Sequence, residues 1–597
     1  MTSATRTAAA VAATPATQRQ RTHELDAPLV ALFLFSVCLK LLLLPSYTST
    51  DFEVHRNWLS LTHTLPRRLW YVDHTSPWTL DYPPFFAYFE YVLSVVAAQV
   101  LLDKDKVLVL SRIPITSPSL VLFQRVSVIA SDVVLFYAVY AYCASWPSVT
   151  TTEWAFSKAK RSAILLVTVL DAALLYVDHI HFQYNGMLLG LLILSATKFR
   201  LQEDRRGALY YAVLLMFKHI YLYAAPLYFV YLLGHYCYVK KAGLEVADGS
   251  FEDCYDDANM TIKMLRKRSI SSTDVHETLQ DLQDGNVTFS LVRFLHLGAI
   301  VLAVFACAFG SLLWDHEDPI VGIQQIVSRL FPVQRGLCHA YWAPNVWALY
   351  AFLDKVLLIL GFPASTEGVA LMSGGLVQEA SFAVLPTVSP IVCAVLTFAM
   401  MIPVLRSVWK YPDSSLFTSA LAYCMLCSFL LGYHVHEKAI LQVTLPLALL
   451  AADSVAGMRL YRFAAGVATI SLFPLLFTPA EQGSKVLLGA CHALLAEVVL
   501  VPLLKQSLKD RHIKVTAVGM SMFERVFLAG LTGLAFLAAV FPYVPRIGVR
   551  YPFLPLMLIS VGCAVGNIYV WGFAVTQHFR KLDAVKYYLD AQRPTRR

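Results

Sequence analysis

Charged residues are scarce in this sequence. Asp, Glu, Lys and Arg together make up 15% of its 597 residues, whereas 57% are hydrophobic. Soluble globular domains carry about 25% charged residues, so this composition excludes a soluble protein and is typical of a chain that crosses a membrane many times. The net charge of +8 is modest, and the basic residues are scattered among loops, which argues against a nucleic-acid partner.

A cleavage site, an internal repeat and a redox cysteine pattern are also missing. Because the first apolar segment has no small-residue cleavage site, we expect residues 1–26 to stay attached as a disordered cytosolic tail. The lack of a repeat gives little support to the inverted halves found in many transporters. The 11 cysteines lie mostly within apolar segments, and packing explains the pair Cys424 and Cys427 better than a redox role.

Long apolar runs dominate what is present. About fourteen are long enough to span a bilayer, and two more, 83–102 and 345–360, are ambiguous. We therefore expect an all-α polytopic membrane protein. The fourteen runs are 27–44, 119–143, 161–177, 184–198, 208–222, 224–239, 291–313, 383–405, 416–433, 437–452, 460–478, 484–504, 526–544 and 551–573.

The charges of the loops predict how these runs are oriented. Basic loops such as 198–206 and 505–514 share the cytosolic face with both termini only if 83–102 and 345–360 do not cross. Each of those two runs is then an interfacial or re-entrant helix. The same number of membrane crossings places every polar cluster on the non-cytosolic face. These clusters lie in the segments 45–118, 178–186, 217–223, 328–345 and 434–438.

This orientation predicts three parts of the chain. After the tail, residues 27–459 form a transmembrane module that carries all the polar loops, and residues 460–597 form a scaffold that ends in a short cytosolic tail. The hydrophilic insert at 242–290 falls on the cytosolic side, and its mixed charge is typical of a regulatory or disordered loop. The non-cytosolic loops of the module are 45–118, 178–186, 314–382 and 434–438.

Acidic residues are dense directly after the first apolar run. Asp51 and Glu53 stand just past its end, where a carboxylate can face water while the apolar scaffold holds its position. A catalytic role for Asp51 and an N-cap role for the helix that follows are supported equally by its position. Asp81 stands before Pro83 and Pro84, which stop a helix, and a cap or turn role is favoured for it.

The motif DHIHFQYNG places two histidines and two amides between apolar runs. The spacing of His179 and His181 could ligate a metal, but no matching carboxylate or cysteine pattern accompanies them. Hydrogen bonding to sugar hydroxyls is favoured, with Gln183 and Asn185 as bidentate partners. A simple turn at Asn185 and Gly186 stays open as an alternative.

Basic and aromatic residues mark further segments. Lys438 in HVHEK suits an anionic lipid phosphate, and Glu437 beside it could orient that lysine; an inert interfacial salt bridge is the alternative. Arginine is a natural bidentate partner for phosphate, and flat aromatic faces stack on sugar rings, although Trp and Tyr also anchor chains at membrane interfaces. The other candidate substrate ligands are Glu53, Asp81, His179, His181, Lys218, Arg329, Arg335, His339, Trp342 and His436.

Together these motifs resemble those of the endoplasmic-reticulum glucosyltransferases that use dolichyl-phosphate glucose. The resemblance covers the chain from about residue 28 to 575. Within the family, the loop GLCHAYWAPN favours the branch that adds the second glucose over the branch that adds the first. The motifs are STDFEVHRNWL, WTLDYPPFFAYFEY, LFQR, DHIHFQYNG, FKHIYLY, SRLFPVQRGLCHAYWAPNVWALY and HVHEKAIL.

The resemblance implies a fold, two substrates and a location. It implies a GT-C-type glycosyltransferase of the endoplasmic-reticulum membrane, with 27–459 as the catalytic module and a lumenal site. The donor would be dolichyl-phosphate glucose and the acceptor a dolichyl-pyrophosphate oligosaccharide within the lipid bilayer. No metal, other cofactor or obligate protein partner is implied.

The resemblance also implies roles for single residues. Asp51 matches the general base of the family, and we expect it to deprotonate the 3-hydroxyl of the terminal glucose of the acceptor. Asp81 is the alternative general base. Asp81, His436 and Glu437 match further polar residues of the site.

The stereochemistry then sets an expected geometry. A β-linked donor and an α-linked product require one in-line displacement with inversion. Cations that stabilise the departing phosphate are therefore expected opposite Asp51 across the sugar, and we assign this role to Lys438, Arg335 and Arg329. A lipid-phosphosugar transporter is the rival class, but its polar residues would lie at mid-membrane depth rather than at one face.

Overall fold

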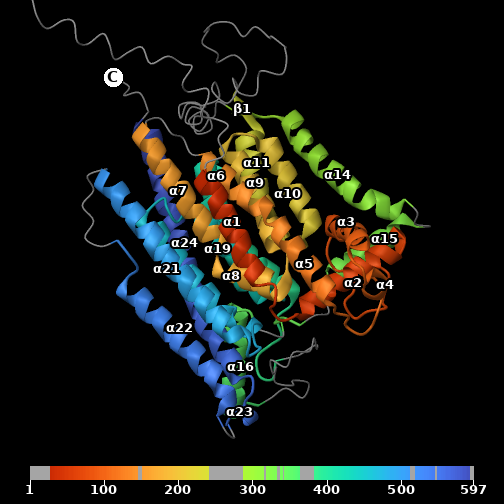
Figure 1. Ribbon diagram of the computed structural model, residues 1–597. Helices are drawn as coiled ribbons and strands as arrows, with labels where there is room; N and C mark the ends of the chain where they lie inside the picture. The colour runs from red at the N-terminus through yellow and green to blue at the C-terminus, as the bar shows by residue number, and fades with distance from the viewer. Residues whose placement is uncertain are drawn as a thin grey trace, which may run out of the picture.

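The chain folds into a helical bundle in a computed structural model (Figure 1). The predicted tail at 1–26 and the residue Arg335 fall outside the described part of the chain. The described residues are 27–145, 151–240, 287–314, 318–331, 336–339, 342–363, 382–510, 518–544 and 547–591.

Helices form wherever the sequence carries an apolar run. In the first part of the chain they are α1 (Ala27–Leu42), α2 (Thr50–Thr64), η2 (Arg67–Leu69), α3 (Pro84–Val100), α4 (Lys104–Val107), α5 (Pro118–Ser131), α6 (Val133–Ala144), α7 (Thr151–Val169), α8 (Ala172–Leu174), the π-helix η3 (Leu175–Phe182), α9 (Asn185–Arg200), α10 (Asp204–Phe217), η4 (His219–Ala224) and α11 (Ala225–Tyr236). In the second part they are α14 (Leu291–Leu313), α15 (Pro319–Leu330), α16 (Val346–Ile359), α17 (Pro390–Lys410), α18 (Ser414–Leu431), η5 (Glu437–Ile440), α19 (Leu441–Leu450), α20 (Val455–Ser471), η6 (Phe473–Leu475), α21 (Glu481–Asp510), α22 (Met522–Val540), η7 (Phe541–Tyr543), α23 (Ile547–Arg550) and α24 (Leu554–Ala591).

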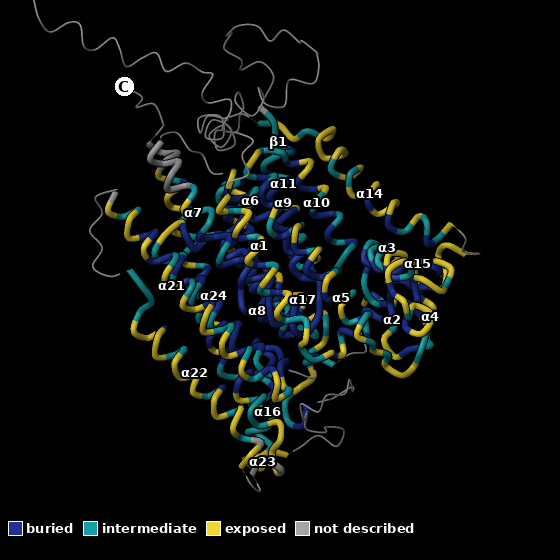
Figure 2. Tube along the Cα trace, viewed as in Figure 1, coloured by how far each residue is buried: buried dark blue, intermediate teal, exposed yellow. Residues whose placement is uncertain are grey.

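Among the described residues, eight helices are long and apolar enough to cross a membrane, fewer than the fourteen predicted. The other six predicted runs also form helices, namely α1, α9, α10, α11, α19 and α20, but these contain only 10 to 17 residues. They are shorter because polar caps, 3₁₀ turns or short loops interrupt the apolar runs. The chain is a polytopic membrane protein, and its exposed helix faces are apolar, for example at Leu302 and Phe536 (Figure 2).

A short antiparallel sheet corrects the all-α prediction. Strands β1 (Tyr238–Lys240) and β2 (Val287–Phe289) pair with Tyr238 opposite Phe289 and Lys240 opposite Val287. They flank residues 241–286, which hold most of the predicted insert. The end of that insert is therefore ordered as β2, and Ser290 caps α14 by accepting a hydrogen bond from the N–H of Arg293.

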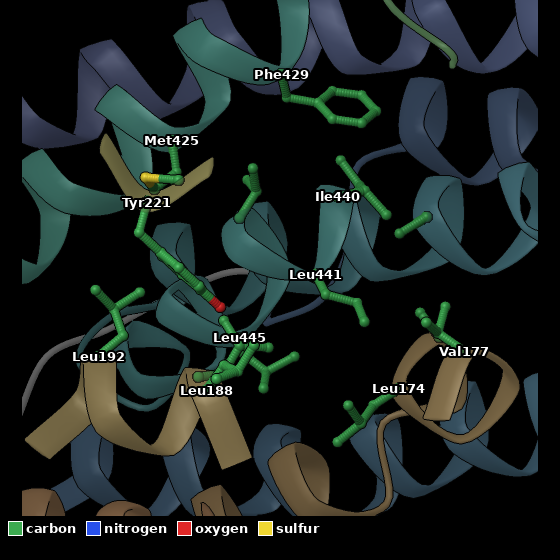
Figure 3. Close-up of a cluster of buried hydrophobic side chains, with 14 of the residues drawn as sticks. Leu174, Val177, Leu188, Leu192, Tyr221, Met425, Phe429, Ile440, Leu441 and Leu445 are labelled. Carbon is green, nitrogen blue, oxygen red and sulfur yellow. The ribbon is translucent and has the colours of Figure 1, made fainter. Parts of the chain in front are cut away.

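The buried core lies in the middle of the bundle (Figure 2). Figure 3 shows apolar side chains from α8, η3, α9, η4, α18 and the start of α19 facing one another. Three elements of this cluster carry or border a predicted polar residue: His181 lies in η3, Lys218 directly precedes η4, and Lys438 lies in η5, which contributes Ile440. The same packing that removes apolar surface from water therefore fixes the position of those polar segments.

The segment between α1 and α5 forms a separate group of short helices at one side of the bundle. Helix α2 packs on α3, and η2 meets α14, while α15 lies beside them (Figure 1). On α15, Gln325 donates a hydrogen bond to the carbonyl of Tyr71 at 3.1 Å. Helix α3 is 17 residues long and α16 is 14, so both ambiguous runs form helices shorter than a typical membrane span.

A buried ion pair joins the first helix to the bundle. The ammonium of Lys40 lies 2.6 Å from Oδ2 of Asp132, and both side chains are at most 5% exposed. Asp132 also contacts Nε2 of His179 at 2.8 Å. Charges this deep are tolerated only when they are paired, so this contact fixes how α1 packs against the α5–α6 junction.

We predict that Lys40→Met destabilises the protein by roughly 3–5 kcal/mol, because it leaves the Asp132 charge buried without its ammonium partner. The measurement is the thermal loss of monodisperse protein in detergent. Lys586→Met is the matched control, since it removes an exposed ion pair with Asp583 that contributes at most about 1 kcal/mol. Equal melting of Lys40→Met and the wild type would contradict the role given to this pair.

Candidate active site

Asp51 lies in the first turn of α2, but it does not cap that helix. The cap is Ser49, whose hydroxyl accepts a hydrogen bond from the N–H of Phe52. The same hydroxyl donates to the carbonyl of His181, which ties the start of α2 to the end of η3. The cap interpretation of Asp51 is therefore wrong, and its carboxylate is available for other contacts.

Three segments that are far apart in the sequence meet at this carboxylate. Oδ2 of Asp51 lies 2.6 Å from the ammonium of Lys438, 2.5 Å from the amide nitrogen of Gln183 and 3.4 Å from Nε2 of His181. The sequence predicted that these residues share one site, and the structure brings them together.

The charges around Asp51 determine its ionisation. Burial raises the pKa of this carboxyl, but the Lys438 ammonium and the His181 ring outweigh burial and hold its pKa well below the usual value. Asp51 is therefore a carboxylate at neutral pH. Lys438 was expected on the far side of the substrate sugar; instead it pairs directly with Asp51, because two opposite charges this close in a partly buried site attract strongly.

Two residues in the left-handed region of backbone space shape the site. Phe182 has a φ of 97° and stands between His181 and Gln183, so the chain turns sharply there and both neighbours reach Asp51. His434 has a φ of 51° at the start of HVHEK. Its N–H donates to the carbonyl of Leu337 at 3.0 Å. Such strained backbone in non-glycine residues concentrates at functional sites.

Lys218 adds a second cation to this region. Its ammonium donates to Oδ1 of Asn185 at 3.1 Å and lies 5.0 Å from the ring centroid of Tyr82. The Tyr82 hydroxyl in turn donates to Oε1 of Gln183 at 3.5 Å. Asp81 directly precedes Tyr82 and so borders the same group. Asn185 begins α9 rather than forming a turn with Gly186.

Glu53 and His179 were predicted to bind substrate, but the structure places both in buried networks. Glu53 pairs with the guanidinium of Arg56, one helical turn further along α2, and accepts from the N–H of Ile115 at 3.1 Å. His179 contacts Asp132 and is only 4% exposed. Residues two apart in the helical segment η3 point in different directions, so only His181 of the histidine pair reaches Asp51.

The loop 336–339 joins the HVHEK segment at the edge of the site. The rings of His339 and His436 are 3.8 Å apart between centroids, and Nδ1 of His339 lies 3.7 Å from the Glu437 carboxylate. Burial and the neighbouring His339 and Lys438 hold the pKa of His436 well below its usual value, so this ring is neutral. Ligand atoms of His339, His434 and His436 lie within 4.8 Å of one another, and these three residues are the part of the described chain that could hold a metal.

Two of the residues predicted from the loop at 328–345 lie apart from Asp51. Arg329 donates from Nε to the carbonyl of Tyr71 at 3.1 Å and contacts the His74 ring. Trp342 is 3% exposed, and its carbonyl accepts from the Ser560 hydroxyl at 2.8 Å. Both residues hold loops in place, because the contacts described above join them to neighbouring segments of the protein.

Sequence reasoning missed two residues that support the site. The guanidinium of Arg125, in the motif LFQR, donates to the carbonyls of Ser46, Tyr47, His179 and Ile180. Tyr47 contacts Nδ1 of His181 and reaches the segment 460–597, which the sequence suggested was featureless scaffold. An arginine within an apolar run was the only signal for the first, and no sequence signal marked the second.

Comparison with known proteins identifies the family of this chain. Residues 36–574 match the model of the ALG6, ALG8 glycosyltransferase family. The dolichyl pyrophosphate Glc1Man9GlcNAc2 alpha-1,3-glucosyltransferase of Arabidopsis thaliana is 39% identical over 90% of this chain and 95% of its own length. The proteins of the same name from Bos taurus and Mus musculus are 40% and 41% identical, each over 91% of this chain and 94% of their own length. This chain belongs to the ALG6, ALG8 glycosyltransferase family.

Proposed function

We propose that this chain transfers glucose from dolichyl-phosphate glucose to the terminal glucose of Glc1Man9GlcNAc2-pyrophosphoryl-dolichol. The product has an α-1,3 linkage, and the site faces the lumen of the endoplasmic reticulum. The names of the relatives support this acceptor, and the match covers more than nine-tenths of the length of each relative. The gathering of Asp51, Lys218 and Lys438 at the ends of apolar helices supports a site at the membrane surface.

One observation carries the role of Asp51 as general base. All its contacts converge on Oδ2, and within the described residues no hydrogen bond reaches Oδ1. The side chain is 19% exposed, so a substrate hydroxyl can approach the carboxylate. An ionised carboxylate with one oxygen held and the other open is suited to accept a hydroxyl proton.

The ammonium groups of Lys218 and Lys438 can stabilise the charge of the departing phosphate. Dolichyl phosphate departs as a stable anion whose second pKa is about 6, so a cation assists its departure more than a proton donor would. When the donor enters, its phosphate offers Lys438 a second anion in place of Asp51. As Lys438 moves to the phosphate, Asp51 loses its neighbouring positive charge and becomes a stronger base. Donor binding therefore activates the group that deprotonates the acceptor.

Asp51→Asn should lower turnover by roughly 10²–10⁴-fold, because an amide cannot accept the proton. The assay is product formation by purified protein in detergent from dolichyl-phosphate glucose and a monoglucosylated acceptor. Asp105→Asn, an exposed acid on α4, is the control for expression and handling. If Asp51→Asn retains wild-type turnover while Asp81→Asn is inactive, the base is Asp81 instead.

An acceptor series separates this proposal from its alternatives. Purified protein should glucosylate the acceptor that carries one glucose and leave acceptors with none or two unchanged, because the proposed reaction extends an arm that carries a single glucose. The measurement is chromatographic separation of the released glycans. Efficient use of the acceptor with no glucose would assign the first-glucose reaction. No transfer to any acceptor in detergent, where transport has no compartment, would favour a transporter.

Lys438→Met should raise the KM for dolichyl-phosphate glucose by roughly 10- to 100-fold, the effect of losing one charge-assisted hydrogen bond. The KM for the acceptor should stay within a few-fold of the wild type. Lys198→Met provides the control, because that lysine pairs with Glu203 at the other end of α9. A change confined to the acceptor KM would contradict the phosphate role of Lys438.

A further inference from the structure

Tyr47 lies between α1 and α2 and has no part in the roles given above. Its hydroxyl oxygen is 2.8 Å from the carbonyl oxygen of Leu475 and 2.7 Å from Nδ1 of His181. A carbonyl oxygen can only accept a hydrogen bond, so the single phenol proton is donated to Leu475. The hydroxyl oxygen is then the acceptor for Nδ1, and His181 carries a proton on that nitrogen.

This arrangement determines the state of the other ring nitrogen. With a proton on Nδ1, the neutral His181 ring has its lone pair on Nε2. Nε2 is 3.4 Å from the ammonium of Lys438 and 3.4 Å from Oδ2 of Asp51. The neutral ring accepts from Lys438, and the protonated ring can donate to Asp51. Nε2 can therefore gain and lose a proton while the contact between Nδ1 and Tyr47 stays intact.

A proton acceptor is needed beside Asp51. An unperturbed imidazole has a pKa of about 6.5 and an Asp carboxyl one of about 3.9. Burial and the Lys438 ammonium disfavour the protonated ring of His181, but the pKa of Asp51 is also held well below its usual value, so the imidazole is the stronger base. Asp51 is the weaker base of the two, and Gln183 still donates to its Oδ2, so Asp51 is suited to take the proton but not to keep it. Among the described groups in contact with Oδ2, Lys438 is already protonated and the Gln183 amide is not basic, so His181 is the group that can accept a proton.

We propose that Nε2 of His181 receives the proton that Asp51 removes from the acceptor hydroxyl, and that Tyr47 is the positioning residue that keeps Nε2 open for it. This step rests on the proposed function. The hydroxyl O–H bond breaks as the new glycosidic C–O bond forms, and the proton passes through the Asp51 carboxyl to Nε2. The protonated ring releases it to water after the product leaves, so no oxidant or reductant is required.

The C-terminal part of the chain holds Tyr47 in place. Leu475 belongs to η6, and the backbone N–H of Tyr47 donates to Oε1 of Glu481 at 2.9 Å. From the other side, Arg125 donates to the carbonyl of Tyr47 at 2.8 Å. Residues after 460 thus set the tautomer of a histidine in the site, which gives this segment a part in the reaction beyond packing.

Tyr47→Phe tests the proposal, with Tyr176→Phe as the matched control. The Tyr176 hydroxyl also donates to a backbone carbonyl of the C-terminal segment, that of Lys485, but its partner is not an imidazole. Both variants remove one phenol oxygen and its hydrogen bond to a backbone carbonyl, and Tyr47→Phe also removes the contact with His181. Tyr47→Phe should therefore lower the melting temperature at least as much as Tyr176→Phe. The readout is the pH profile of turnover at saturating donor and acceptor, together with both KM values.

Tyr47→Phe should lower turnover at neutral pH by roughly 10- to 100-fold and leave both KM values within a few-fold of the wild type. Wild-type turnover should fall on the acid side as Nε2 becomes protonated. The charged groups that face His181 are Asp51, Glu437 and Lys438, and Tyr47→Phe leaves all three in place. Because the Tyr47 oxygen favours the protonated ring, its removal lowers the pKa of His181 and moves the acid limb to lower pH.

The outcomes separate this proposal from the proposed function. Tyr176→Phe should keep wild-type turnover and the wild-type acid limb. If Tyr47→Phe matches Tyr176→Phe in turnover and in acid limb, or loses turnover without a shift of the acid limb, Tyr47 is only structural and the proposal is overturned. An inactive Asp51→Asn would in that case still support Asp51 as the general base. If Asp51→Asn remains active, the proposed function itself fails.

Discussion

The contact between the Asp51 carboxylate and the Lys438 ammonium is the interaction on which the site depends. The two residues are 387 positions apart in the sequence, and their atoms lie 2.6 Å from each other. Removing both charges from water costs several kcal/mol, which only a close and well-bonded pair offsets. A small shift of α2 relative to η5 would break that balance. The packing of the bundle therefore has to fix these two short elements to within a fraction of an ångström.

The supports for this contact come from every part of the chain. The apolar side chains of η3, α9, η4, α18 and α19 pack against one another (Figure 3), and η3 also carries His181. The left-handed residues Phe182 and His434 give the two polar loops their turns, and the bundle compensates their strain. From the far end of the sequence, Leu475 and Glu481 bind Tyr47. The site is thus a product of the whole fold rather than of one module.

The helices and the members of the site could be predicted from sequence for the same reason. Apolar runs mark membrane helices, and ionisable residues at their ends are too costly to occur without a partner or a function. This logic identified Asp51, Gln183, His181 and Lys438. It could not tell which face of a helix a residue occupies, so it also selected Glu53 and His179, which the structure pairs with Arg56 and Asp132.

Other features of the site carried no local signal. A tyrosine in a short connection has no pattern that reveals a partner more than 400 residues away, as Tyr47 and Leu475 show. The end of one helix was misplaced because hydropathy does not register 3₁₀ turns such as η4, which takes up the last residues of the predicted run 208–222, so that α10 ends at Phe217. The pairing of β1 with β2 was missed because each strand has only three residues.

Arg125 has a consequence for the behaviour of this protein in different lipids. Its guanidinium binds carbonyls on both the segment that precedes α2 and the end of η3. Arg125 therefore joins these two segments directly, and its hydrogen bonds do not depend on the tilt of the helices α1 and α7 that precede them. When bilayer thickness changes, membrane helices adjust mainly by tilting. The clamp lets α1 and α7 accommodate such a change while the spacing between Asp51 and His181 is preserved.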